Sequence, residues 1–419
     1  MHGKSIIIIG AGVLGLSTAY YAARQGHHVT VLDRGTADDL NCSYGNCGLI
    51  VPSHFIPLAA PGMVPLALKW MFNPESPFYL KPRLDADLLS WAWRFFRAAN
   101  PVHVRRCAPL LRDLNIASAK CFKEFARSHG NSFELETKGC FCLCKTEHRL
   151  EDEAKVVQHA KELGIEAGVL SAKEIAAREP RIRMDIVGGV YFKDDCHLTP
   201  AKFMAALKAE VQRVGVAIHW SSEVTGWKAN GSRIESVQTV NQQFTADEFV
   251  LCAGTWSPVI ARDLSLKLPM QPGKGYSITL PEPPMRPSIP AILTEARVAV
   301  TPMGNSLRFG GTMEIAGLKE GINPARVRGI MKSVPKYYPD FTRKDFEGVQ
   351  PWSGLRPCSP DGMPYIGRTS RYTNFAIGTG HAMMGLSLGP ITGKLLAEII
   401  SGQKPSINIE SLSPDRYGK

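Results

Sequence analysis

The chain of 419 residues is long enough for about two domains of ordinary size, and its 44% apolar and 21% charged residues are typical of a globular protein. Its 49 lysines and arginines exceed its 38 aspartates and glutamates, which gives a formal charge of +11 at neutral pH. The basic residues are spread without a run typical of a nucleic-acid arm, so we expect no nucleic-acid partner, and the charge alone selects no other.

The predicted elements begin with a strand, a helix and a second strand, over Ser5–Gly10, about Val13–Gln25 and His28–Asp33. The first strand is too short for a membrane span or an export signal. Ten cysteines are scattered without the spacing of a disulfide framework, so we predict a reducing, cytoplasmic location with free thiols.

A proline- and glycine-rich stretch follows over Pro52–Pro82, and an irregular segment of this length is usually a functional loop or lid. Within it, Met63–Phe72 is apolar with Lys69 and Trp70 at one end, which suits either peripheral contact with the inner face of the plasma membrane or packing in a core or pocket. Helical spacing, a capping box at Ser171 and a proline after Thr199 predict the later helices, near Asp85–Ala98, Val102–His129, His148–Leu163, Ser171–Glu174, Thr199–Val214 and Leu386–Ser401.

Further strands are expected near Phe133–Lys145, Val216–Trp220, Arg233–Val240, Phe249–Cys252, Val298–Thr301 and Ser306–Gly311. In the first of these, Cys140, Cys142 and Cys144 alternate, so on a strand they share one face. A metal site there is one interpretation, but no nearby His or Cys pair completes it. We therefore favour small core residues and expect no bound metal.

The run Gly10-Ala11-Gly12-Val13-Leu14-Gly15 lies between a predicted strand and a predicted helix, the context of a dinucleotide-binding turn. Gly10 permits the tight turn, Gly12 lets a pyrophosphate approach the backbone, and Gly15 lets the helix pack on the strand. The N–H groups at the helix start favour phosphates, and Asp33 is placed to accept hydrogen bonds from ribose hydroxyls. The pattern does not distinguish FAD from NAD, but it occurs once, whereas a flavoprotein reduced by NAD(P)H normally needs two nucleotide sites.

Further motifs resemble those of the D-amino-acid oxidase superfamily of FAD-dependent oxidoreductases, over nearly the whole chain. Ser43–Gly48 is similar to the family's flavin-contacting loop, and Val250–Ser257 is similar to its second FAD motif. Gly354–Gly367 resembles the pattern of glycine oxidase, and Gly378–Gly385 resembles the C-terminal loop that lies against the flavin ring. Ala59–Phe72 is most similar to the bacterial D-amino acid dehydrogenases.

The resemblance implies an α/β fold with a discontinuous Rossmann-like FAD-binding domain and a substrate domain of antiparallel sheet and helices. We expect residues 1–52, 195–265 and 352–419 in the first domain, and residues 53–194 and 266–351 in the second.

FAD is expected to bind non-covalently, because the place of the tethering cysteine of sarcosine-type oxidases falls near Gly354, out of register with Cys358. The helix after residue 385 is expected to direct N–H groups at the flavin. The expected FAD contacts are Gly10, Gly12, Val13, Leu14, Gly15, Asp33, Arg34, Ser43, Asn46, Cys47, Gly48, Val224, Ala253, Gly254, Trp256, Gly354, Gly380, His381, Met383, Met384 and Gly385.

The resemblance also implies oxidation of a Cα–N bond to an imine by hydride transfer to flavin N5. A carboxylate is best bound by a planar two-pronged cation, and we assign Arg356 that role, unless it only ties its own turn to the sheet. Tyr276 is expected near the substrate, although a buried tyrosine satisfied elsewhere explains it nearly as well. His54 lines the pocket or is a surface histidine, His381 donates to the flavin ring, and Arg308 is a second candidate anion contact.

We therefore expect an FAD-dependent dehydrogenase of a small D-amino acid or cyclic imino acid, such as D-proline or 4-hydroxy-D-proline, that passes electrons to a quinone or other carrier. An oxygen-using oxidase of the glycine or sarcosine type is the alternative. A flavin-containing assembly or RNA-modifying protein is a third reading, which the net positive charge favours weakly and the carboxylate motif disfavours.

Overall fold

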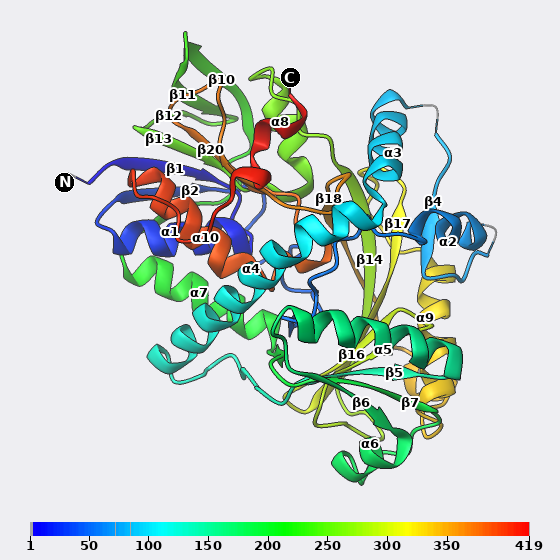
Figure 1. The fold of residues 1–419 in the computed structure, drawn as a ribbon. Coiled ribbons are helices and arrows are strands. Elements are labelled where there is room, and N and C mark those ends of the chain that lie inside the picture. The colour runs from blue at the N-terminus through cyan, green and yellow to red at the C-terminus, as the bar shows by residue number, and fades with distance from the viewer. Residues whose placement is uncertain (1–2, 72, 84, 419) are drawn as a thin grey trace.

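The computed structural model describes residues 3–71, 73–83 and 85–418. The described chain forms two large sheets, one of six strands and one of nine, and helices cover both (Figure 1). In Figure 1 the six-stranded sheet lies on the left with α1, α7 and α10, and the nine-stranded sheet lies on the right and below. The predicted α/β fold is confirmed.

The six-stranded sheet has the order β19-β20-β13-β1-β2-β9, and all neighbours are parallel except β19 and β20. Its central strand reads Ile6-Ile7-Ile8-Ile9 and is buried throughout, as expected for a parallel strand covered on both faces. The strands are β1 (Ser5–Ile9), β2 (His28–Leu32), β9 (Ala217–His219), β13 (Glu248–Leu251), β19 (Tyr365–Arg368) and β20 (Phe375–Thr379).

Helix α1 (Val13–Arg24) packs against α10 (Gly389–Ile400) and α7 (Pro200–Arg213) beside this sheet. The two helices α1 and α10 approach closely at Gly393, where an added Cβ would lie 2.4 Å from the Ser17 carbonyl carbon. Glycine is required at this crossing because any side chain would push the helices apart.

The nine-stranded sheet has the order β18-β14-β17-β16-β15-β5-β7-β6, with β4 paired to β17, and most neighbours are antiparallel. Helices α5 and α9 pack against it. Its strands are β4 (Phe78–Leu80), β5 (Cys140–Cys144), β6 (Ala167–Ser171), β7 (Gly188–Phe192), β14 (Gln271–Leu280), β15 (Ala291–Leu293), β16 (Val298–Met303), β17 (Ser306–Ile315) and β18 (Trp352–Cys358).

Two smaller sheets complete the strands, β10 (Val224–Asn230) with β11 (Arg233–Thr239) and β12 (Gln243–Thr245), and β3 (Leu49–Ile50) with β8 (Cys196–His197). The remaining α-helices are α2 (Met63–Trp70), α3 (Ala86–Ala98), α4 (Pro101–Ser128), α5 (Glu147–Glu162), α6 (Ala172–Arg178), α8 (Ser257–Arg262) and α9 (Pro324–Tyr337). Short 3₁₀ turns occupy Gly254–Trp256, Arg343–Phe346, Ala382–Met384, Glu410–Leu412 and Pro414–Tyr417.

The capping box predicted at Ser171 is present, with reciprocal hydrogen bonds to Glu174. The stretch predicted as irregular instead contains helix α2, because Pro65 lies in the first turn, where a missing N–H group costs little. Phe72, at the end of the predicted apolar segment, lies outside the described residues. The last helix begins at Gly389 rather than at Leu386, after the 3₁₀ turn Ala382–Met384.

The predicted strand over Phe133–Lys145 is shorter than expected, since its first half contributes only an isolated bridge of Glu136 with His197 before β5. All five residues of β5 are buried, so the prediction that its cysteines are core residues is confirmed. No group of three or more His, Cys, Asp or Glu side chains in the described part of the chain could hold a metal ion. The domain boundaries stay a prediction, and β18, expected with the FAD-binding unit, pairs with β14 in the nine-stranded sheet.

Candidate active site

A cavity of about 1400 Å³ is lined by residues of both large sheets. Pockets for single drug-sized ligands span roughly 300–1000 Å³, so this cavity has room for a dinucleotide and a small substrate together. All three predicted catalytic residues and most predicted cofactor contacts line it, namely His54, Tyr276, Arg356, Gly10, Gly12, Val13, Leu14, Asp33, Arg34, Ser43, Asn46, Cys47, Val224, Ala253, Gly254, Trp256, Gly354, His381, Met383, Met384 and Gly385.

Three predicted contacts, Gly15, Gly48 and Gly380, do not line the cavity. Each is instead pressed against its neighbours. An added Cβ would lie 1.8 Å from the Gly10 carbonyl oxygen at Gly15, 2.1 Å from the Leu198 carbonyl oxygen at Gly48, and 2.7 Å from the Tyr365 ring at Gly380. These three glycines therefore permit close packing behind the lining residues and do not face the cavity themselves. For Gly15 this is the helix packing that the sequence predicts.

The turn between β1 and α1 has the geometry that a pyrophosphate needs. Gly10 has φ +107°, and an added Cβ would lie 2.5 Å from the Cys252 carbonyl oxygen, so only glycine fits. The first turn of α1 carries no acidic residue, and its Val13 N–H donates to the Ser43 hydroxyl at 3.1 Å. The helix start is therefore electropositive and lies at the cavity wall, where an anion is favoured.

Asp33 and Arg34, which directly follow β2, also line the cavity. The Asp33 carboxylate accepts the N–H groups of Ala11 at 2.6 Å and Gly35 at 2.8 Å, which fixes its orientation and leaves further lone pairs for a ribose. The Arg34 guanidinium lies over the Trp256 ring, 3.8 Å from its centroid. The contact of Arg34 with Trp256 therefore joins the first and second predicted FAD motifs, which lie far apart in the sequence.

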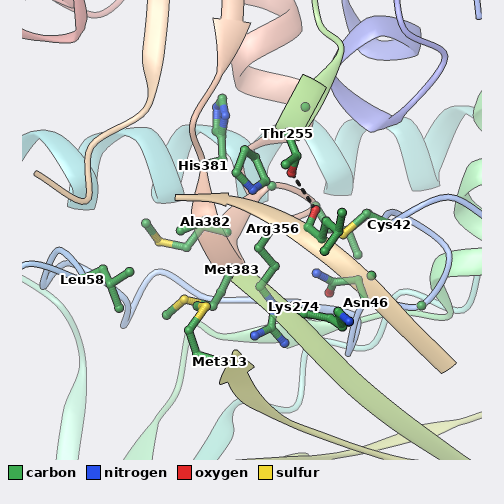
Figure 2. A pocket seen from close by; sticks show the side chains of 18 of the residues that line it. Cys42, Asn46, Leu58, Thr255, Lys274, Met313, Arg356, His381, Ala382 and Met383 are labelled. Atoms are coloured by element: carbon green, nitrogen blue, oxygen red, sulfur yellow. Dashed lines mark hydrogen bonds between the residues drawn. The ribbon is translucent and has the colours of Figure 1, made fainter. Parts of the chain in front are cut away.

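Trp352, which sequence reasoning missed, lines the cavity between two glycines of separate motifs. An added Cβ at Gly45 or at Gly354 would lie 2.1 Å from its indole ring. The Thr255 hydroxyl also donates to the Leu355 carbonyl at 3.1 Å, which ties the second predicted FAD motif to β18 (Figure 2). Its place just before the Gly354–Gly367 motif is the sequence signal that could have identified Trp352.

Arg356, on β18, lies at the centre of the pocket, between Asn46 and Met313 in Figure 2. Its side chain crosses β14 at Gly275, where an added Cβ would lie 2.1 Å from the guanidinium. Nη1 donates to the Thr312 carbonyl at 2.6 Å, and no carboxylate of the described chain pairs with the charge. The guanidinium is thus anchored at one nitrogen and keeps its remaining donors for an anion.

Tyr276 is buried in β14, and its ring lines the cavity. Its hydroxyl donates to Glu314 Oε2 at 2.5 Å, a residue that sequence reasoning missed. Burial and the hydrogen bond to Glu314 both raise the pKa of Tyr276, so the hydroxyl stays protonated. The hydroxyl of Tyr276 thus has its hydrogen-bond partner within the protein, as the alternative interpretation expects. A contact between its ring and the substrate stays a prediction.

His54 is half-buried at the cavity wall rather than on the outer surface. Its Nδ1 lies 3.2 Å from the Ser53 hydroxyl, which in turn donates to Asp195 Oδ2 at 2.6 Å. Burial, with the nearby Arg297 charge, lowers the pKa of His54 to about 4, so the ring is neutral at physiological pH. Burial raises the pKa of Asp195 to about 7, against the opposing hydrogen bonds from Ser53.

Two other predicted roles meet competing contacts. His381 Nε2 lies 2.9 Å from the Thr392 hydroxyl of α10, which commits one ring nitrogen away from the cavity. Burial lowers the pKa of His381 to about 3, so its ring is neutral. Arg308, considered as an anion contact, instead donates to the carbonyl oxygens of Tyr44 and Asn46 and so holds the Ser43–Gly48 loop in place.

The chain matches the family described as FAD dependent oxidoreductase over residues 5–399. It belongs to this family. D-amino acid dehydrogenase of Bradyrhizobium diazoefficiens is 32% identical, with 98% of each chain covered. D-amino acid dehydrogenase of Allorhizobium ampelinum is 33% identical, again with 98% of each chain covered.

The fold is similar to solved members of the same structural class. Glycine oxidase from Geobacillus kaustophilus superposes with a TM-score of 0.79 at 21% identity, covering 100% of both chains. L-proline dehydrogenase from P. horikoshii superposes with a TM-score of 0.75 at 17% identity, covering 100% of this chain and 98% of that chain. The expected family, fold and FAD cofactor are confirmed.

The lining of the cavity fits the FAD that this family of oxidoreductases uses. The lining includes residues of all four predicted FAD-contact segments, namely the turn at Gly10–Val13, Ser43, Gly254 and Ala382–Gly385. Cys42 and Cys47, in the loop that begins before Ser43, also line the cavity, and burial raises the pKa of the half-buried Cys47 thiol. The size and donor set of this lining therefore fit the dinucleotide.

Proposed function

We propose that this oxidoreductase is a dehydrogenase that oxidises the Cα–N bond of a small D-amino acid or cyclic imino acid, such as D-proline or 4-hydroxy-D-proline, to the imine. The single observation that carries the proposal is the guanidinium of Arg356, which enters the cavity without a carboxylate partner in the described chain. A substrate carboxylate satisfies it, and amino and imino acids present this group beside the oxidisable carbon.

FAD, when bound, supplies a ring that accepts hydride from the substrate carbon. The chain's own residues then orient and shield the substrate. Arg356 holds the carboxylate at a fixed place on β18, and positioning of this kind accounts for a large part of enzymatic rate. Apolar side chains that line the same cavity, including Leu58, Met313 and Met383, exclude water from the reacting carbon (Figure 2).

We propose that FAD is held non-covalently, as the sequence predicts. Cys358, the cysteine nearest the expected tether, is fully buried with its Sγ towards the Met313 sulfur, and it does not line the cavity. Burial raises the pKa of the half-buried Cys47 thiol in the cavity lining, which disfavours the thiolate that a covalent link requires. Acid precipitation should release the yellow colour into the supernatant, and colour retained in the pellet would contradict non-covalent binding.

We propose that a quinone or other carrier, rather than oxygen, takes the electrons. The cavity lining includes apolar residues of α2 and α3, among them Val64, Leu68, Phe95 and Phe96. Leu68, Phe96 and the neighbouring Trp93 are exposed, which suits a peripheral contact with a membrane that supplies a quinone. No described helix is long and apolar enough to cross a bilayer.

Substrate-dependent turnover in air tests the acceptor. We expect the enzyme to reduce a soluble quinone analogue many times faster than it forms hydrogen peroxide. Peroxide formed in equal amount to the imine, at an undiminished rate, would reassign the chain to the oxygen-using oxidases. No bleaching of the flavin by any amino or imino acid under anaerobic conditions would instead refute the proposed reaction.

A further inference from the structure

The loop between β15 and β16 places a second arginine at the cavity wall. Arg297 lines the cavity, and its residue surface is exposed. It forms no hydrogen bond or ion pair through its side chain with any described residue. Its backbone has φ +54°, a conformation uncommon outside glycine, asparagine and aspartate. Residues in such strained conformations concentrate at functional sites.

Charged neighbours surround Arg297 on the cavity side. Arg149 and Glu153 of α5 line the same cavity and pair with each other at 2.5 Å. Burial raises the pKa of Glu153. Two cations thus lie beside one carboxylate, and Glu153 pairs with Arg149. The exposed guanidinium of Arg297 is left without a carboxylate partner among the described residues.

The backbone of Arg297 lies beside the part of β17 to which Arg356 is hydrogen-bonded. Arg356 reaches across Gly275 to the carbonyl of Thr312 on β17. On the other side of β17, the Arg297 carbonyl oxygen lies 3.0 Å from the position of a Cβ added to Gly311, the residue before Thr312. The backbone of Arg297 and the anchor of Arg356 thus lie on opposite sides of β17, and both residues line the same cavity.

We infer that Arg297 binds a second oxygen acceptor on the substrate, so that the preferred substrate is an amino or imino acid with a carboxylate or hydroxyl on its side chain. The inference rests on the proposed function, because it needs Arg356 to hold the α-carboxylate. A side-chain carboxylate pairs with the unpartnered charge. A hydroxyl oxygen accepts a hydrogen bond from Arg297 as well. A purely aliphatic side chain leaves Arg297 without a partner.

The test compares pairs of substrates that differ only in a side-chain carboxylate or in a ring hydroxyl. Anaerobic flavin reduction is measured for D-glutamate against D-norvaline, and for 4-hydroxy-D-proline against D-proline. A site built to bind a polar group discriminates strongly against the analogue that lacks it, so we expect at least about a tenfold preference in one of the pairs. The pair that shows the preference identifies whether a carboxylate or a hydroxyl is bound.

The Arg297→Met variant should reduce that preference to less than about threefold. Arg297→Asn serves as a second variant, because asparagine tolerates a positive φ and preserves the backbone of the loop. The matched control is Arg183→Met, which removes an exposed guanidinium that pairs with Asp340 on the outer surface, and it should retain the wild-type preference.

Equal reduction rates within both pairs in the wild-type enzyme would overturn this inference and leave the proposed function standing. A preference that survives in both Arg297 variants would also overturn it. If none of the four compounds, and no other amino or imino acid, reduces the flavin, the proposed function fails and this inference fails with it.

Discussion

Arg356 and Thr312 are joined by a hydrogen bond of 2.6 Å from the guanidinium to the backbone carbonyl, across the strand that lies between them. Thr312 has φ +67°, which is strained for a β-branched residue, at an irregular point in the pairing of β14 with β17. This local strain directs the carbonyl that fixes one nitrogen of the guanidinium. The other donors are thereby held at a constant place in the cavity.

Replacing Arg356 should weaken substrate binding more than it alters the fold. Arg356→Met removes a charge-assisted contact with the substrate carboxylate, and we expect a loss of about 2–4 kcal/mol in binding free energy. Arg356→Lys, the matched control, keeps the charge but loses the planar fork, so its loss should be smaller. Substrate dissociation constants from anaerobic titration measure both. Wild-type affinity in Arg356→Met would remove this residue from the substrate site.

Tyr276→Phe should act mainly on stability. The change leaves the buried Glu314 carboxylate without its hydroxyl partner, which costs about 1–3 kcal/mol of unfolding free energy. The limiting rate of flavin reduction should fall by less than about tenfold, because the hydroxyl does not transfer a proton in the reaction. Removing a group that did so would lower the rate by roughly 100-fold or more. Urea unfolding and stopped-flow reduction provide the two readouts. A much larger loss of rate at unchanged stability would assign the hydroxyl to the reaction.

The contact of α1 with α10 should control cofactor retention. An added methyl group in Gly393→Ala would lie 2.5 Å from the Thr18 nitrogen, so α1 must shift and carry the phosphate-binding turn with it. Overpacking of this kind costs about 1–3 kcal/mol, and we expect weaker FAD binding and a lower melting temperature. Gly168→Ala is the control, since nothing lies within 4 Å of its added Cβ. Equal FAD retention in both variants would argue against this coupling.

Acid should weaken the attachment of the C-terminal segment. Burial alone would raise the pKa of Asp361, but the charge and hydrogen bonds of Arg416 outweigh it and hold the pKa below its usual value. A depressed folded-state pKa means that the pair stabilises the fold above the ordinary pKa of aspartate. That stabilisation is lost as pH falls through the folded-state pKa.

Asp361→Asn leaves Arg416 buried without its partner, so at neutral pH it should lower the unfolding free energy by about 3–5 kcal/mol. The difference between variant and wild type should shrink as the pH falls below the ordinary aspartate pKa. Denaturant unfolding across this range checks the trend. A difference that does not change with pH would show that the ionised carboxylate is not what stabilises the segment.

The nucleotide-binding half of the site could be predicted from the sequence because its determinants are local. Gly10, Gly12 and Gly15 lie in one turn, and the strand and helix on either side carry their own patterns. Arg356 was predicted because it lies inside a recognisable motif, and the structure places it in the cavity.

Other parts of the site depend on pairings between distant segments. Glu314 reaches Tyr276 only because β17 pairs with β14, and Trp352 reaches Gly45 from the far end of the chain. Arg297 lies in a short loop whose sequence gives no sign of a cavity. The α2 helix is absent from the predicted elements because a proline costs a helix little only in its first turn, and the local composition does not show that Pro65 lies there. Predicting such contacts requires knowing which strands pair and in what register, and the sequence pattern alone does not determine this.

The central claim is that Arg356 holds an amino or imino acid so that its α-carbon faces a bound flavin. Anaerobic bleaching of the flavin, measured with a panel of D-amino acids, L-amino acids and cyclic imino acids in wild type and Arg356→Met, tests it most directly. The account predicts rapid bleaching by a subset of D-amino or cyclic imino acids in the wild type, and strongly weakened saturation in the variant. A purified protein that cannot take up flavin, or a flavin that no compound in the panel reduces, would contradict it.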